Sequence, residues 1–251
     1  SNFSFLEKSK LLVAVSGGLD SMVLVYLCQK LDLNFSLAHC NYKLREIESN
    51  YDEDFIKSYA KTDSIELFTT SFDTNSYASL TKQSIQMAAR KLRYEWFELL
   101  QEQHGFDFVL TAHHADDNLE TFLINLSRGT GLEGLTGIPA INGSIIRQLL
   151  EFTRTEILDF ATAKNLKWRE DSSNKKVLYL RNNIRHSIIP LLKYKMGSKA
   201  LQYTMAHNQP NELLKFFLPI EYKVIPVSAP AIALGKRALN SLMPNKFMHN
   251  A

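Results

Sequence analysis

The stretch LLVAVSGGLDSMVLVYL, residues 11–27, decides the fold. Residues 11–15 form a short apolar run that predicts a buried strand, and residues 21–31 show the apolar period of a helix. Between them, SGGLDS (residues 16–21) places glycines, serines and an aspartate where a helix begins. A helix start offers free backbone N–H groups and the positive end of its dipole. The stretch therefore predicts a strand, an anion-binding loop and a helix, in that order.

Apolar runs of strand length alternate with helical patterns along most of the chain. A capping-box pattern from Thr153 to Glu156 adds one more predicted helix start. Because such alternation builds a parallel sheet covered by helices on both faces, we expect an α/β fold with a Rossmann-like, doubly wound parallel sheet of about five strands. The other predicted strands are residues 35–40, 65–70, 106–112 and 144–147, and the other predicted helices are residues 49–61, 84–103 and 116–127.

Chemically capable residues follow the predicted strands. The first strand leads into SGGLDS, and the second ends near His39. The fourth is followed by HHADDNLET, residues 113–121, and the fifth ends at Arg147. Because ligands of parallel sheets bind beyond the carboxyl ends of the strands, we expect the functional site at this edge.

The SGGLDS loop differs from the common phosphate-binding motifs. It lacks the lysine of a Walker loop and the spacing of G-x-G-x-x-G. Its N–H groups and hydroxyls suit phosphate, whereas Asp20 would repel phosphate unless a divalent cation lay between them. Mg²⁺ prefers this combination of carboxylate and phosphate oxygens. The alternative is an ordinary turn in which Asp20 only caps the helix.

The composition is that of a soluble globular protein, with 45% hydrophobic and 22% charged residues. A net charge of +3 permits a nucleic-acid partner without requiring one. We expect no membrane segment, since no apolar run approaches the roughly 20 residues that span a bilayer. We also expect no signal peptide, since the first residues show no basic region and no apolar core. Cys28 and Cys40 form no C-x-x-C pair, which argues against zinc, iron–sulfur and disulfide frameworks and predicts a cytoplasmic protein.

The SGGLDS loop resembles the PP-loop, the SGG-x-D-S signature of the ATP pyrophosphatase (N-type) superfamily. Members break the bond between the α- and β-phosphates of ATP, adenylate a substrate and release pyrophosphate. The resemblance implies an adenine nucleotide α-hydrolase-like fold with ATP and Mg²⁺ as cofactors. The nucleotide-binding residues it implies in the loop are Ser16, Gly17, Gly18, Leu19, Asp20 and Ser21.

Further motifs resemble one branch of this superfamily, the tRNA(Ile)-lysidine synthetases. Of these, RGTGLEGL (residues 128–135) and RNNIR (residues 181–185) are more specific than the first loop. These enzymes attach free L-lysine to C2 of the wobble cytidine in the CAU anticodon of isoleucine tRNA. The reaction passes through an adenylated cytidine and releases AMP and pyrophosphate. The resemblance therefore implies a carbon–nitrogen ligase acting in tRNA modification.

Three carboxylates receive catalytic roles from this resemblance. Asp20 and Asp117 are the expected Mg²⁺-linked residues, and Glu120 lies one helical turn beyond Asp117 on the same face. The structural alternative for Asp117 and its neighbour Asp116 is simple capping of the helix that follows.

The other expected catalytic residues are Arg90, Arg93 and His113. The two arginines lie three apart on one predicted helix, so they share a face, and the alternative is a solvated basic face. They are expected to stabilise the adenylate or to contact tRNA phosphate. For the histidine, the sequence does not separate His113 from His114, although we prefer His113.

The remaining expected contacts are with the nucleotide, the tRNA and the lysine. His39 and Gly129 are expected to contact ATP, although Gly129 could equally serve an ordinary crossover. Arg128, Arg181 and Arg185 are expected to contact tRNA or lysine.

We expect residues 1–195 to form the PP-loop catalytic domain. Residues 196–251 carry no recognised motif and are expected to be a small, partly helical appendage, the start or a remnant of a tRNA-binding domain. One alternative function is another PP-loop adenylating enzyme, a tRNA thiolase or an amidotransferase-type synthetase, and another is an inactive tRNA-binding relative. The missing cysteine pair argues against a thiolase, and the carboxylates argue against an inactive relative. The oligomeric state stays open, with a homodimer as one option.

Overall fold

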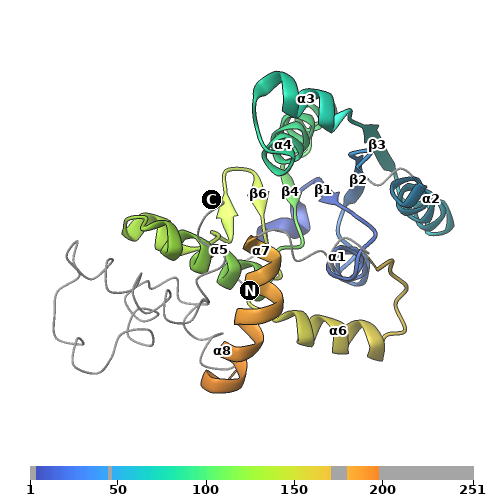
Figure 1. Ribbon diagram of the computed structural model, residues 1–251. Helices are drawn as coiled ribbons and strands as arrows, with labels where there is room; N and C mark the ends of the chain where they lie inside the picture. Colours follow the sequence, from blue (N-terminus) through green and yellow to red (C-terminus); the bar gives the residue numbers. More distant parts are fainter. Residues whose placement is uncertain (1–3, 45–46, 171–179, 198–251) are drawn as a thin grey trace, which may run out of the picture. The chain divides into compact units, whose positions relative to one another are not determined.

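The computed structural model describes residues 4–44, 47–170 and 180–197 of the chain (Figure 1). These residues form two compact units, each of which is described by itself. The first unit contains the described residues up to His113, with Ala140–Leu149 and residues 154–170. The second unit contains His114–Pro139, Leu150–Thr153 and residues 180–197. The expectations for residues 198–251 lie outside the described residues.

The first unit is built on a six-stranded sheet in the order β3-β2-β1-β4-β6-β5. Neighbouring strands are parallel except for the pair β5–β6. The order runs outward from β1 in both directions, which is the doubly wound arrangement, so the predicted α/β fold is confirmed. The strands are β1 (Leu11–Ala14), β2 (Phe35–Asn41), β3 (Leu67–Ser71), β4 (Phe108–Leu110), β5 (Ile141–Asn142) and β6 (Ile145–Ile146).

The sheet has one strand more than the sequence predicted. The extra strand, β5, is only two residues long and pairs antiparallel with β6. Gly143 joins them with a φ of +58°, a left-handed conformation that glycine adopts at little cost. A two-residue strand shows no periodicity in the sequence, so the local signal for it was the glycine turn between β5 and β6.

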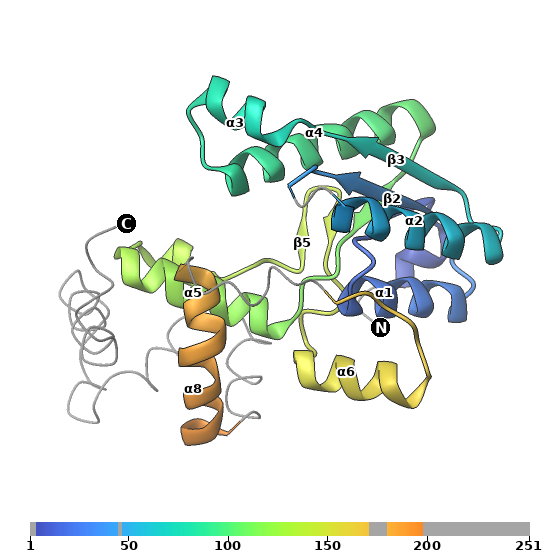
Figure 2. The ribbon, with the colours of Figure 1, turned by 45° about the vertical axis from the view of Figure 1, so that its right-hand side comes forward.

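Helices cover both faces of the sheet, as Figure 2 shows for α4 on one side and α1 and α2 on the other. The helices of the first unit are α1 (Leu19–Lys30), α2 (Ile47–Thr62), α3 (Thr74–Thr81), α4 (Ile85–His104) and α6 (Arg154–Ala163), and a 3₁₀ turn spans Ser4–Lys8. The sequence predicted all of these helices except α3.

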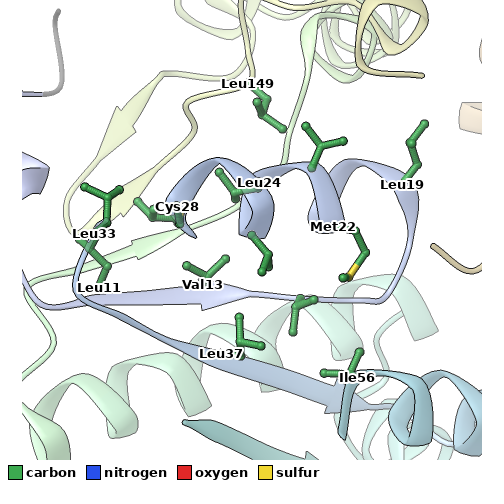
Figure 3. Packing of buried hydrophobic residues seen from close by; sticks show 14 of the residues in the cluster. Leu11, Val13, Leu19, Met22, Leu24, Cys28, Leu33, Leu37, Ile56 and Leu149 are labelled. Atoms are coloured by element: carbon green, nitrogen blue, oxygen red, sulfur yellow. The ribbon is translucent and has the colours of Figure 1, made fainter. Parts of the chain in front are cut away.

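The strand β1 is buried on both faces, which explains its continuous apolar sequence. Leu11 and Val13 pack in one cluster with residues of α1 and with Ile56 of α2 (Figure 3). Ile157 of α6 belongs to the same cluster. Leu12 packs on the opposite face with Phe97 of α4 and Val109 of β4. Since β1 is held from both sides, the loop that follows it starts from a rigid position.

The second unit is helical. Its longest helix, α5, carries Leu119, Phe122, Leu123 and Leu126 at the spacing of one buried face. These side chains pack with residues of the following turn and helices to form a core separate from that of the sheet. The elements are α5 (Ala115–Arg128), a 3₁₀ turn (Leu132–Thr136), α7 (Leu180–Asn183), a π-helical turn (Ile184–Ile188) and α8 (Ile189–Met196).

Candidate functional site

The loop between β1 and α1 is held by its own serines. The Gly18 N–H donates to the Ser16 hydroxyl at 3.3 Å, and the Ser21 hydroxyl donates to the Gly18 carbonyl at 2.9 Å. Gly17 has a φ of +82°, which a residue with a side chain adopts only with strain. The backbone conformation therefore favours glycine at this position.

The start of α1 is built like an anion-binding site. Gly18 is the N-cap residue, and no described side chain caps the helix there. The N–H groups of the first turn are among those that lack partners inside a helix, and they carry the positive end of the dipole. An anion such as phosphate suits this position.

Asp20 lies inside the first turn of α1, two residues after the N-cap, so it does not cap the helix as the alternative interpretation required. Its carboxylate instead forms an ion pair with Arg154, the first residue of α6. The Nη1 atom of Arg154 lies 3.0 Å from Oδ2 and 3.4 Å from Oδ1 of Asp20. The side chains of Arg154 and Asp20 are 47% and 24% exposed, so ligands can reach both.

His39 lies at the end of β2 and is buried. Its Nδ1 lies 2.9 Å from the carbonyl oxygen of Val15, and because a carbonyl only accepts, Nδ1 carries the proton. Burial lowers the pKa of His39 and outweighs the Val15 hydrogen bond and the charges of nearby carboxylates, so the ring stays neutral near pH 7. Its Nε2 is then an acceptor, and within the described residues it has no hydrogen-bond partner.

Arg90 and Arg93 gather around one aromatic ring. Their guanidinium carbons lie 4.9 and 5.1 Å from the ring centre of Tyr94, within cation–π range. Burial opposes ionisation of Tyr94, but the charges of Arg93, Arg90 and Arg147 outweigh it and lower the pKa of this phenol. In the described ranges, no carboxylate pairs with Arg90 or Arg93. The group is therefore strongly positive and differs from a helix face laced with ion pairs.

The structure gives different tasks to the two neighbouring histidines. His114 is buried and is the N-cap residue of α5, where its Nδ1 accepts from the Asp117 N–H at 3.4 Å. His113 is half-buried, and its Nδ1 hydrogen-bonds with the Thr111 hydroxyl at 3.0 Å. His114 thus caps α5, and the preference for His113 as the functional histidine stays a prediction.

Asp117 has structural partners on both carboxylate oxygens. Its Oδ2 accepts from the backbone N–H of His114 at 3.1 Å, which completes the capping box of α5. Its Oδ1 accepts from Arg185 Nη2 at 3.2 Å. Asp117 therefore takes part in the capping box of α5, and its predicted role as an Mg²⁺ ligand stays a prediction. Asp116 instead forms an ion pair with Lys193 of α8 at 2.6 Å.

Glu120 is fully buried and bound by two arginines. Arg181 Nε donates to one oxygen at 2.7 Å, and Arg185 Nε donates to the other at 2.6 Å. A second contact from Arg185 Nη2, at 3.0 Å, closes the network. The structure thus brings together Asp117, Glu120, Arg181 and Arg185, four of the predicted site residues, in the second unit.

Gly129 and Arg128 end α5. Gly129 is the C-cap residue with a φ of +69°, the left-handed conformation of many helix ends. Arg128 is exposed in the last turn, where a positive charge complements the helix dipole. These local roles account for both residues, and their predicted ligand contacts stay predictions.

The predicted carboxylates differ in how well they fit Mg²⁺. This ion usually takes one or two carboxylates and keeps phosphate and water ligands, so it needs no larger cluster. The described residues contain no group of three or more His, Cys, Asp or Glu side chains placed to hold a metal. Asp20 fits, because it is accessible and lies where phosphate would bind. Glu120 does not fit, because its side chain is fully buried and each of its oxygens accepts from an arginine.

Asp20 and Asp117 belong to different units, so their sharing of one ion stays a prediction.

Sequence reasoning missed Arg154 as a neighbour of the loop. The available signal was a basic residue at a helix start, where the dipole disfavours positive charge unless a partner compensates.

Among the described helices, none combines the length and the apolar character needed to cross a bilayer.

A doubly wound parallel sheet whose first strand leads through a glycine loop into an uncapped helix defines an α/β domain of the nucleotide-binding class. The chain belongs to the PP-loop domain family, whose profile matches residues 2–192. The predicted family resemblance is therefore confirmed.

Curated relatives cover the same part of the chain. A tRNA(Ile)-lysidine synthase of Porphyromonas gingivalis is 45% identical over 191 residues, which are 75% of this chain and 42% of that protein. The tRNA(Ile)-lysidine synthase of Chlorobaculum tepidum is 41% identical over 76% of this chain and 59% of that protein, and that of Bacillus subtilis is 36% identical over 75% and 41%. The chain thus spans about half the length of the curated relatives that it matches.

Among solved structures, the U34-tRNA thiolase NcsA from Methanococcus maripaludis, with its [4Fe-4S] cluster, matches with a TM-score of 0.64. The match covers 87% of this chain and 76% of that chain at 18% sequence identity, so it supports the fold alone.

Proposed function

We propose that this chain is the ATP-using, lysine-ligating part of a tRNA(Ile)-lysidine synthase. The observation that carries the proposal is the loop after β1, where an uncapped helix start and the accessible carboxylate of Asp20 lie together. This combination suits a nucleotide bound with a divalent cation. The names of the relatives matched over three quarters of the chain favour lysidine synthesis among PP-loop reactions.

The proposed reaction has two steps. First, the C2 carbonyl oxygen of the wobble cytidine attacks the α-phosphorus of ATP, and the bond to the bridging oxygen breaks and releases pyrophosphate. The ε-amine of lysine then attacks C2 and loses a proton, while AMP leaves with the former carbonyl oxygen. Adenylation is needed because a carbonyl oxygen is a poor leaving group. Mg²⁺, when bound, neutralises phosphate charge, and Asp20 is the carboxylate best suited to hold it.

The first unit supplies the nucleotide chemistry in this proposal. The loop residues 16–21 bind the phosphates, and neutral His39 offers an acceptor to a hydroxyl or amino group of the nucleotide. His113, oriented by Thr111, hydrogen-bonds a phosphoryl oxygen or transfers a proton. Arg90 and Arg93 neutralise negative charge on the adenylate or on tRNA phosphate.

The second unit supplies contacts to the acceptor substrates. Arg181 and Arg185 are held by Glu120 but keep 41% and 28% of their side chains exposed. A guanidinium fixed on one side by a carboxylate can bind an anion on the other. We propose that these arginines and Arg128 contact the tRNA backbone or the lysine carboxylate.

The thiolase alternative is disfavoured by the cysteines. Burial raises the pKa of Cys28 to about 12 and that of Cys40 to about 11, so both thiols stay protonated near pH 7. Sulfur transfer and cluster ligation both require thiolates. Reduced, unpaired thiols and a tRNA substrate both suit a cytoplasmic protein.

The test is release of AMP and pyrophosphate from ATP with Mg²⁺, using unmodified isoleucine tRNA with and without labelled lysine. The proposal expects release to depend on tRNA, and the label to enter isoleucine tRNA but not methionine tRNA, which shares the CAU anticodon. AMP release driven by another acceptor, with no label in tRNA, would retain the PP-loop chemistry and reject lysidine synthesis.

A further inference from the structure

We propose that Arg154 binds the β- and γ-phosphates of ATP and stabilises the pyrophosphate that leaves. The inference rests on the proposed function and adds to it a residue outside the recognised motifs. Arg154 begins α6, 134 residues after Asp20 in the chain, yet its guanidinium lies 3.0 Å from the Asp20 carboxylate. Both residues belong to the first unit, so the contact lies within one compact body.

The chemistry of the loop requires a cation that the loop itself lacks. A Walker loop carries a lysine that reaches the β- and γ-phosphates, whereas residues 16–21 carry one carboxylate and no basic side chain. Breaking the bond between the α- and β-phosphates leaves added negative charge on pyrophosphate. Catalysis of phosphoryl and nucleotidyl transfer relies mainly on neutralising such charge by cations held in place.

Arg154 is placed to supply this charge. Its partner, Asp20, lies in the first turn of α1, next to the N–H groups where phosphate would bind. A guanidinium has five N–H donors in a planar fork, so it can contact a carboxylate and a phosphate together. Phosphates bound at the start of α1 would therefore lie within reach of Arg154.

Arg169 also contacts the loop, but its side chain has a different partner. The backbone N–H of Arg169 donates to the Gly17 carbonyl, while its Nε contacts Asp52 of α2. That side chain thus serves to tie α2 to the segment after α6. Arg154 instead forms its pair with the one acidic residue of the loop.

A purely structural role explains Arg154 poorly. A half-exposed ion pair contributes little to stability, because water and salt screen it. A positive charge in the first turn of α6 also opposes the helix dipole. The position is unfavourable for stability and favourable for binding an anion at the loop.

The experiment compares the affinities of ATP and AMP, each with Mg²⁺, for the wild-type chain and for Arg154→Met, Arg154→Lys and Lys164→Ala. Lys164 is an exposed cation beyond the other end of α6 and serves as the matched control. We expect Arg154→Met to weaken ATP binding at least about tenfold, the loss typical of one charge-assisted hydrogen bond. AMP has no β- and γ-phosphates, so its affinity should change less than about twofold.

Arg154→Lys should recover part of the ATP affinity, and Lys164→Ala should change neither affinity. At saturating ATP, Arg154→Met should also slow pyrophosphate release by at least about tenfold. Equal weakening of ATP and AMP, or no change in either, overturns the assignment. A wild-type chain that binds no ATP rejects the proposed function as well, whereas ATP binding that is insensitive to Arg154 rejects only this inference.

Discussion

Replacing Glu120 by alanine tests whether this carboxylate organises the second unit. Glu120 has no exposed surface and accepts hydrogen bonds from Arg181 and Arg185 at 2.6–3.0 Å. Breaking a fully buried ion pair by removing one partner costs about 3–5 kcal/mol. Because the two arginines are 41% and 28% exposed, water recovers part of this loss, and we expect about 3 kcal/mol.

Hydrogen exchange is the suitable assay, since it reports each helix separately. A loss of about 3 kcal/mol in local stability accelerates exchange through local opening about a hundredfold. The acceleration should appear in α5, α7 and α8 and not in β1 or α1, which lie in the first unit. Glu98→Ala, an exposed carboxylate of α4, is the control and should leave all of these segments unchanged. Unchanged exchange in α5 and α8 of Glu120→Ala would refute the view that this network holds the unit together.

Three further predictions concern the first unit. Asp20→Ala should reduce pyrophosphate release at least about a hundredfold. It should change the free energy of unfolding by less than about 1 kcal/mol, because the ion pair of Asp20 is half-exposed. Pyrophosphate release at the wild-type rate would contradict the role of Asp20 at the phosphates. Gly17→Ala and Gly105→Ala should each cost about 1–2 kcal/mol of stability, since both positions have positive φ, but only the change at Gly17 should weaken ATP binding. His39 has a lowered pKa in the folded chain, so below about pH 6.5 the unfolded chain binds more protons than the folded chain. The wild type therefore loses stability as the pH falls through this range. His39→Gln should show a flatter dependence of Tm on pH between about 5.5 and 7.5, and a parallel profile would count against burial of a neutral ring.

The sequence predicted the elements whose signals are local. The run from Leu11 to Val15, the two glycines and the period of the next helix were all readable, because a buried strand and an amphipathic helix each impose a pattern on neighbouring residues. The helix α3 was missed since its eight residues, TNSYASLT, are mostly polar and show no clear apolar stripe. The one local signal was Asp73, whose side chain caps the helix by accepting from the Ser76 N–H.

The side-chain pairs of the site were not readable in the same way. Arg154 contacts Asp20 across 134 residues, and Arg181 contacts Glu120 across 61. No periodicity connects residues so far apart, because the contact depends on how the helices pack. The motifs indicated which residues matter. They could not show that Glu120 accepts hydrogen bonds from Arg181 and Arg185, which the sequence analysis expected to contact tRNA or lysine.

Burial separates two carboxylates that the sequence treated alike. Asp20 and Glu120 were both predicted to be catalytic, yet the side chain of Asp20 is 24% exposed with a half-exposed arginine beside it, whereas Glu120 has no exposed surface. A carboxylate that binds an ion or exchanges partners during a reaction must be reached by ligand and water. A fully buried carboxylate held by two guanidiniums would lose several hydrogen bonds by leaving them. We therefore expect the ligand-binding chemistry at Asp20, whereas the hydrogen bonds of Glu120 hold Arg181 and Arg185 in position.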